Sequence, residues 1–208
     1  MRICKYETGK LNSNTYFVMN DETNEGFLVD CGGSPKDIAL LIDREGLVPK
    51  GILLTHGHID HIEGADGIAK RYGCPVFIHE YDSSFLVRPE ENLSVRLGYP
   101  SFSLSVEPSL LRDGDILELA DFSVEVIHTP GHTAGSVCFR CGEVIFTGDT
   151  LFYESVGNDL PPYGSLSDEI DSIRRKLFSL EEDCICYPGH GIETTLNHEK
   201  KYNMFCRV

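Results

Sequence analysis

The sequence predicts an α/β fold, and three observations support this prediction. Short segments rich in β-branched and aromatic residues alternate with turn residues over the first thirty positions. An apolar segment at 50–55 is followed by a helical pattern and then by a second strand-like segment at 75–79. After residue 113 the chain returns to short strands separated by turns. Alternation of strands and helices is typical of sheets covered by helices.

The first half of the chain contains most of the predicted alternation. Three short strands, suited to a sheet edge, are expected at 2–7, 15–19 and 26–30. A helix follows, with Ser34 as its N-cap and Pro35 in its first turn, and it ends at Gly46. The uninterrupted apolar character of 50–55 favours a strand that is buried on both faces. Next we expect a helix at 63–72, a strand at 75–79 and a short helix at 80–87.

In the second half of the chain the sequence predicts mainly strands, with two helices near the end. Residues 80–112 have the least regular pattern. They could form a substrate loop or lid, but an ordinary surface loop agrees with the sequence at least as well. Strands are expected at 116–119, 123–128, 136–141, 143–147 and 184–187. The helices are expected at 168–179, with Ser167 as the N-cap, and at 198–205. We find no linker, and we therefore expect one domain over residues 1–208.

Four potential metal ligands occur within six residues directly after the apolar segment 50–55: His56, His58, Asp60 and His61. Residues two apart point to the same side of an extended backbone, so His56 and His58 face one way, whereas Asp60 and His61 require a turn. Imidazole nitrogen and carboxylate oxygen both bind zinc-like ions. Gly57 is expected to remove a side chain where the backbone crowds the metal. The cluster predicts ligands for two neighbouring ions.

Three further donors occupy loops of the same form, in which a glycine follows the end of a strand. They are His132, Asp149 and His190. Each loop alone is weak evidence, because a Gly-His pair in a turn is more often only a turn. Together with the first cluster they bring the number of potential ligands to seven, and loops at strand ends are where sites collect in such sheets.

Composition excludes several classes of protein. The formal net charge is −15 and no run of Lys or Arg is present, so nucleic acid is not an expected partner. No apolar segment approaches the roughly 20 residues of a membrane span, and the first residues lack a signal-peptide pattern, which predicts a cytoplasmic protein. The eight cysteines favour buried thiols over disulfides. Cys138 and Cys141 form a C-x-x-C in a predicted hairpin, for which a zinc or redox role is the less favoured interpretation.

The ordered set of motifs resembles the metallo-β-lactamase superfamily and, within it, the small glyoxalase II-like hydrolases. The resemblance rests on H-x-H-x-D-H at 56–61, T-P-G-H-T at 129–133, G-D-T-L-F at 148–152 and Y-P-G-H-G at 187–191. It extends over nearly the whole chain. It implies an αββα sandwich, in which two mixed β-sheets pack face to face with helices outside. This architecture agrees with the alternation of elements described above.

The resemblance also implies a dinuclear centre. It places one ion on His56, His58 and His132, a second on Asp60, His61 and His190, and Asp149 between them. The two divalent ions are expected to be zinc, with iron or manganese as alternatives. Asp60 and Asp149 are the carboxylates implied in catalysis. A bridging hydroxide would attack a small-molecule acyl thioester, and the thiolate would leave without a strong acid because its pKa is about 8.5.

Several residues bear on the substrate. Glyoxalase-like members have a basic residue where Gly157 is here followed by Asn158, and the chain ends without their C-terminal helical domain, so glutathione is not implied. Asn158 and Tyr163 are candidate substrate contacts, and Lys200 and Lys201 are weaker ones. The resemblance leaves two alternatives open: a mononuclear iron dioxygenase acting on persulfides, and a non-catalytic or flavodiiron-type module.

Three other polar residues follow predicted strands and are candidates for orienting the ligands. His79 and His128 either hold a ligand ring or are ordinary core or surface histidines. Asp30 either fixes a ligand loop by hydrogen bonding or only forms a turn.

Overall fold

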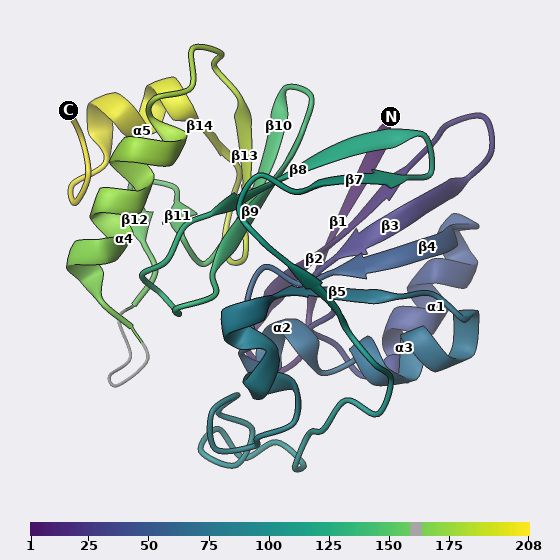
Figure 1. The fold of residues 1–208 in the computed structure, drawn as a ribbon. Coiled ribbons are helices and arrows are strands. Elements are labelled where there is room, and N and C mark those ends of the chain that lie inside the picture. Colours follow the sequence, from purple (N-terminus) through teal and green to yellow (C-terminus); the bar gives the residue numbers. More distant parts are fainter. Residues whose placement is uncertain (159–163) are drawn as a thin grey trace.

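Two six-stranded sheets pack face to face in the computed structural model, which describes residues 1–158 and 164–208 (Figure 1). The first sheet has the order β1-β2-β3-β4-β5-β6, formed by Arg2–Thr8, Ser13–Met19, Glu25–Val29, Val48–Leu53, Val76–His79 and Ser109–Leu111. The second has the order β14-β13-β10-β9-β8-β7, formed by Thr194–Thr195, Ile185–Pro188, Val144–Gly148, Val137–Cys141, Phe122–His128 and Ile116–Leu119. A small hairpin joins Leu151–Phe152 (β11) to Ser155–Val156 (β12).

Helices cover the outer faces of both sheets (Figure 1). On the first sheet these are α1 (Pro35–Glu45) and α3 (Ala65–Tyr72), with the single turn α2 (Ile59–Ile62) and the 3₁₀-helix η1 (Glu80–Leu86) beside them. On the second they are α4 (Leu166–Ser172), its π-helical continuation η2 (Ile173–Leu177) and α5 (Leu196–Tyr202). Strands β3 to β6 run parallel and β1 to β3 antiparallel, and β10 pairs parallel with β13 in an otherwise antiparallel sheet. The expected αββα sandwich of mixed sheets is confirmed.

Three apolar clusters hold the layers together. The central one lies between the sheets, where Tyr16 and Phe27 of the first sheet meet Phe139 and Phe146 of the second. A second cluster packs the first sheet against α1 and α3, and a third packs the other sheet against α4, η2 and α5. Strand β2 is buried along its whole length, so it has no polar face toward solvent. The described cysteines are all free thiols, and seven of the eight are buried.

Most predicted elements form where expected, and the helices show the largest differences. In α1, the side chain of Ser34 accepts a hydrogen bond from the backbone of Asp37, and the helix ends at Gly46 with φ of 70°. The helix expected at 63–72 forms as α3, which begins at Ala65 after the N-cap Gly64, and the single turn α2 that precedes it was not expected. The helix expected from 168 begins earlier, because Ser165 and not Ser167 is the N-cap.

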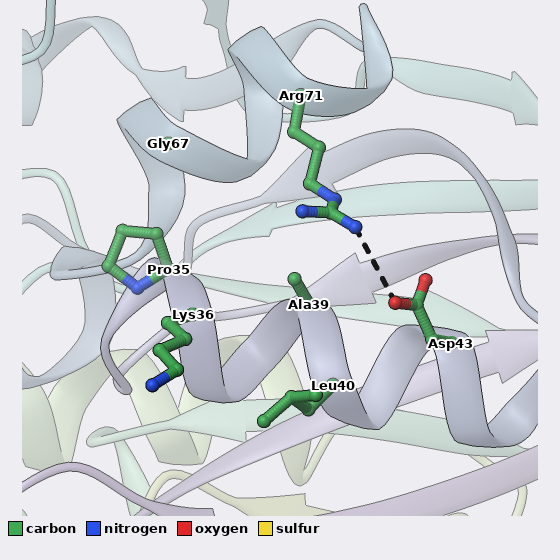
Figure 2. A pocket seen from close by; sticks show the side chains of 7 residues that line it. All are labelled: Pro35, Lys36, Ala39, Leu40, Asp43, Gly67 and Arg71. Atoms are coloured by element: carbon green, nitrogen blue, oxygen red, sulfur yellow. Dashed lines mark hydrogen bonds and ion pairs between the residues drawn. The ribbon is translucent and has the colours of Figure 1, made fainter.

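A shallow groove separates α1 from α3 on the outer face of the first sheet (Figure 2). Pro35 lies opposite Gly67 at one end, and an ion pair of 3.5 Å joins Arg71 to Asp43 across it. A Cβ at Gly67 would lie 2.5 Å from the Cβ of Pro35, so this glycine sets how closely the helices approach. Among the described helices, none is long and apolar enough to cross a membrane.

Candidate metal centre

The seven predicted donors converge at one edge of the sandwich, where strands from both sheets end. The loop and helical turn after β4 contribute four of them, and the loops after β8, β10 and β13 contribute one each: His56, His58, Asp60 and His61, then His132, Asp149 and His190. The helical turn α2 carries Asp60 and His61, which explains how the chain turns between the two pairs. Six of the seven side chains are about nine-tenths buried or more, and the His190 side chain is more exposed.

Asp60, His61 and His190 have the spacing of a metal tripod. The Asp60 Oδ2 atom lies 3.5 Å from His61 Nε2 and 3.2 Å from His190 Nε2, and the two nitrogens are 3.3 Å apart. Ligand atoms at about 2.0–2.1 Å from a tetrahedral ion are separated from one another by about 3.3–3.4 Å. The three measured separations therefore match the edges of such a tetrahedron.

His56, His58 and His132 form a second group of donors. Their ligand atoms lie within 4.8 Å of one another, and His58 Nδ1 is 2.9 Å from His132 Nε2. Asp149 reaches both groups: its Oδ1 is 3.4 Å from His61 Nε2, and its Oδ2 is 3.6 Å from His132 Nε2. This is the position of a carboxylate that can bind two neighbouring ions.

Unpaired buried atoms provide a test of whether this donor set suits a metal ion. Among the described residues, His56 Nε2 and Asp149 Oδ1, two atoms of the donor cluster, are buried without a hydrogen-bond partner. Leaving such an atom unpaired costs about 1–3 kcal/mol, so unpaired atoms are expected to have a partner of another kind. Imidazole nitrogen and carboxylate oxygen are ligands for zinc, iron and manganese alike. The cluster therefore fits divalent metal ions.

Hydrogen bonds to the other ring nitrogen fix the tautomers of three histidines. Nδ1 of His61 donates to Asp30 Oδ2 at 2.8 Å, and Nδ1 of His132 donates to the carbonyl of Asn158 at 2.9 Å. The hydroxyl of Thr55 donates to Asp30 and therefore accepts from His56 Nδ1, which is 3.1 Å away. When each of these rings is neutral, Nε2 keeps its lone pair, as a metal ligand must.

Burial and neighbouring charges set the protonation of the donors. Burial lowers the pKa of His56 well below its ordinary value and that of His58 to about 3. Burial also acts to lower the pKa of His61, but the carboxylates of Asp149, Asp60 and Asp30 outweigh it and raise that pKa. Burial would raise the pKa of Asp149, yet the charge of His61 holds it well below the usual range. His56 and His58 are thus neutral near pH 7, which is the metal-binding form.

Asp30 fixes the ligand loop by hydrogen bonding, which was one of its two predicted roles. Its carboxylate accepts from the backbone and hydroxyl of Thr55 as well as from His61. The residue is buried and has φ of 57°, a conformation that Asp tolerates better than most side chains. A single carboxylate thereby positions ligands on both sides of Gly57.

Asp82 joins two ligand loops, and the sequence did not single it out. Its buried carboxylate accepts hydrogen bonds from Gly57 N at 2.9 Å, Gly135 N at 2.8 Å and Thr133 Oγ1 at 2.7 Å. Gly57 lies between His56 and His58, and Thr133 follows His132. Burial raises the pKa of Asp82 to about 6 although these three bonds act to lower it. The carboxylate therefore connects η1 with the first and second ligand loops.

Replacing Asp82 by alanine is expected to lower the free energy of unfolding by about 3–5 kcal/mol, because two buried backbone N–H groups and one hydroxyl lose their acceptor. Urea unfolding followed by circular dichroism measures the change. Asp43→Ala is the matched control, since the contacts of Asp43, an ion pair with Arg71 and a hydrogen bond from the Tyr72 hydroxyl, are both exposed, and their loss should cost under about 1 kcal/mol. Equal stability of the two variants would show that Asp82 does not hold the loops.

The first sheet also holds the loop that carries His190. The buried side chain of Asn14 on β2 donates to the carbonyls of Pro188 at 2.9 Å and Gly191 at 3.0 Å. Tyr16, two residues along the same strand, donates its hydroxyl to Pro188 O at 2.6 Å. A Cβ at Gly189 would lie 2.1 Å from Asp149 Oδ1, so only glycine allows this loop to approach Asp149.

The expectation for Gly57 is not met, and of the two alternatives for His79 and His128 the described contacts favour ordinary histidines. A Cβ at Gly57 would lie 2.3 Å from the Cβ of Phe85, so this glycine makes room for η1 and not for the metal. The rings of His79 and His128 stack on each other with centroids 4.0 Å apart. No described hydrogen bond joins either of them to a predicted ligand.

A pocket of about 440 Å³ opens over the donor cluster. The described residues that line it are Leu11, His58, Asp60, Leu93, Arg96, Leu97, His132, Asp149, Phe152, Asn158 and His190. Asn158 therefore lies where a substrate contact was expected, whereas Tyr163 lies outside the described residues. Lys200 is absent from this lining and donates to Leu180 O, and Lys201 lies over the ring of Tyr202. Part of the irregular stretch 80–112 forms a wall of the pocket.

Comparisons with known proteins agree with this geometry. The family model described as the metallo-beta-lactamase superfamily matches residues 8–190. Hydroxyacylglutathione hydrolase GloC of Haemophilus influenzae is 34% identical over 195 residues, which are 92% of each chain. The crystal structure of BLEG-1, a B3 metallo-beta-lactamase, has a TM-score of 0.93 at 33% identity and covers both chains completely. The structure of TTHA1623 in a di-iron-bound form has a TM-score of 0.85 at 32% identity, covering 97% of this chain and 99% of that one. The chain belongs to the metallo-beta-lactamase superfamily.

Proposed function

We propose that this chain is a dinuclear metal-dependent hydrolase of acyl thioesters. His56, His58 and His132 would hold one ion, Asp60, His61 and His190 the other, and Asp149 would reach both. The observation that carries the proposal is the set of separations near 3.3 Å among Asp60, His61 and His190, completed by Asp149 at 3.4 Å. The likeness to GloC supports the thioester as the substrate.

The residues around the donors suit this chemistry. The donor groups would hold two divalent ions, which when bound would lower the pKa of water to near neutrality and polarise the carbonyl under attack. Asp30 and the carbonyl of Asn158 hold the rings of His61 and His132 in fixed orientations. A thiolate leaving group has a pKa near 8.5, so the site needs no strong general acid. Leu11, Leu93, Leu97 and Phe152 give the pocket apolar walls that reduce the access of water to the bound acyl group.

The test is an assay of protein loaded with two zinc ions per chain. S-D-lactoylglutathione and a panel of acyl thioesters are offered, and the released thiol is measured. Hydrolysis of at least one thioester with kcat/KM above about 10⁴ M⁻¹s⁻¹ is expected for a working enzyme. If no thioester of the panel were hydrolysed, the proposal that the substrate is a thioester would be wrong.

Parallel assays address the other reactions open to this centre. A β-lactam is included because BLEG-1 is described as a B3 metallo-beta-lactamase. A persulfide is offered in an oxygen electrode because TTHA1623 has been crystallised with two irons. Oxygen consumption with formation of sulfite, at one iron per chain, would assign the dioxygenase reaction in place of hydrolysis.

A further inference from the structure

The pocket over the donor cluster has one wall built from residues 93–97, which lie between η1 and β6. This segment is a tight turn, in which Leu97 N donates to Leu93 O at 2.9 Å and Tyr99 N donates to Ser94 O at 2.8 Å. Leu93, Arg96 and Leu97 line the pocket. The segment is therefore a compact structure with side chains directed at the site.

Two sets of contacts fix this turn relative to the metal ligands. At its base, Ile59 N donates to Asn92 O at 2.8 Å, and Ile59 stands between His58 and Asp60. On its far side, Lys10 Nζ donates to Gly98 O at 2.8 Å. The Lys10 ammonium also lies 4.6 Å from the ring centroid of Tyr99. These contacts hold the turn against the ligand loop and against the β1–β2 turn.

Arg96 is the one lysine or arginine among the described residues that line the pocket. It is exposed, and within the described part of the chain no carboxylate forms an ion pair with it. The protein has 33 acidic residues against 18 basic ones, so arginines readily find carboxylates. Six others do so: Arg44, Arg71, Arg88, Arg112, Arg140 and Arg175. Arg96 thus offers an unused guanidinium at the mouth of the pocket.

We propose that Arg96 binds a carboxylate of the substrate and selects anionic acyl thioesters. A guanidinium recognises a carboxylate through two parallel hydrogen bonds, a geometry that suits a fixed turn. The adjoining leucines and Phe152 would contact the apolar part of the same molecule. The pocket volume of about 440 Å³ is in the range of small-molecule sites. The inference rests on the proposed thioesterase function, but its first test does not require turnover.

Binding is measured by calorimetry on the zinc-loaded protein with two ligands, 3-mercaptopropionate and 3-mercaptopropionamide. They share a thiol and a similar size and differ in charge. In the unchanged protein we expect the dissociation constant of the carboxylate to be ~10-fold lower than that of the amide, and we follow the ratio of the amide value to the carboxylate value. Arg96→Ala should bring the ratio down about 10-fold, and Arg96→Lys should retain part of the preference because it keeps the charge but not the planar fork.

Arg175→Ala is the matched control, because Arg175 is also exposed and its loss removes the same charge at a residue outside the pocket lining. It should leave the ratio as it is in the unchanged protein. A ratio that is equally unaffected by Arg96→Ala would overturn the proposal, and so would a protein that binds both ligands equally.

The S-acetyl derivatives of the two thiols then separate this inference from the proposed function. If both thioesters are hydrolysed and the ratio of their kcat/KM values falls in Arg96→Ala, the result supports the thioesterase function and the role of Arg96 alike. Charge-selective binding without hydrolysis of either would retain the carboxylate site and refute the thioesterase. Hydrolysis of both at equal kcat/KM, with equal binding, would retain the thioesterase and refute the role of Arg96.

Discussion

Asp149→Ala is expected to lower kcat/KM for the best thioester by about 10³-fold, equivalent to about 4 kcal/mol of transition-state stabilisation. The content of tightly bound zinc should fall from two ions per chain toward one. The reason is that Asp149 approaches His61 through one oxygen, at 3.4 Å, and His132 through the other, at 3.6 Å. Plasma mass spectrometry of the dialysed protein gives the stoichiometry, and thiol release gives the rate.

The Asp43→Ala protein serves as the control, because it loses an aspartate whose carboxylate is more than half exposed in the groove between α1 and α3 (Figure 2). It should keep two ions and the full rate. Two ions bound at unchanged affinity in Asp149→Ala would contradict the bridging position of this carboxylate. A lost rate with both ions retained would assign Asp149 to the reaction alone.

Removal of the ions with a chelator is expected to abolish hydrolysis and to lower the Tm by about 10 °C or more. Each site saturated at a free-metal concentration a thousandfold above Kd stabilises the folded state by about 4 kcal/mol. In a chain of 208 residues, about 1 kcal/mol corresponds to about 2–4 °C. Differential scanning calorimetry before and after dialysis against chelator measures the shift.

Adding zinc back should restore both the rate and the Tm, which distinguishes metal removal from irreversible damage. The Asp149→Ala protein should show the smaller shift, because it has fewer ions to lose. If the Tm and the rate were both unchanged at less than about 0.1 ion per chain, the cluster would be a hydrogen-bonded core and not a metal centre.

The seven potential ligands could be identified in the sequence because each lies in a short local pattern. Four ligands follow one apolar segment, and the other three each follow a strand through a glycine, so no long-range information was needed to find them. The two-sided burial of 50–55 likewise placed the first loop at a strand end. Helix boundaries were less certain, because Ser165 and Ser167 are equally good N-caps by residue type and only the structure distinguishes them.

The residues that the sequence did not reveal depend on contacts between distant segments. Asp82 is one carboxylate among many until η1 places it against Gly57 and Gly135. Arg96 lies in a stretch without periodicity, whose position is set by the bond from Ile59 to Asn92 and by Lys10. These contacts between distant segments cannot be predicted from the composition or from the spacing of residues.

The donors come from both sheets, and bound metal ions would therefore take part in the cooperativity of the fold. The first sheet alone presents His56 to His61, which would provide two ligands for each ion of the proposed centre, and the remaining three donors arrive only when the second sheet is docked. Full metal affinity is therefore a property of the docked sandwich, so binding and docking are thermodynamically linked. A substitution between the sheets, at Phe139 for example, would weaken metal binding without touching a ligand, and the bound ions would in turn oppose separation of the sheets.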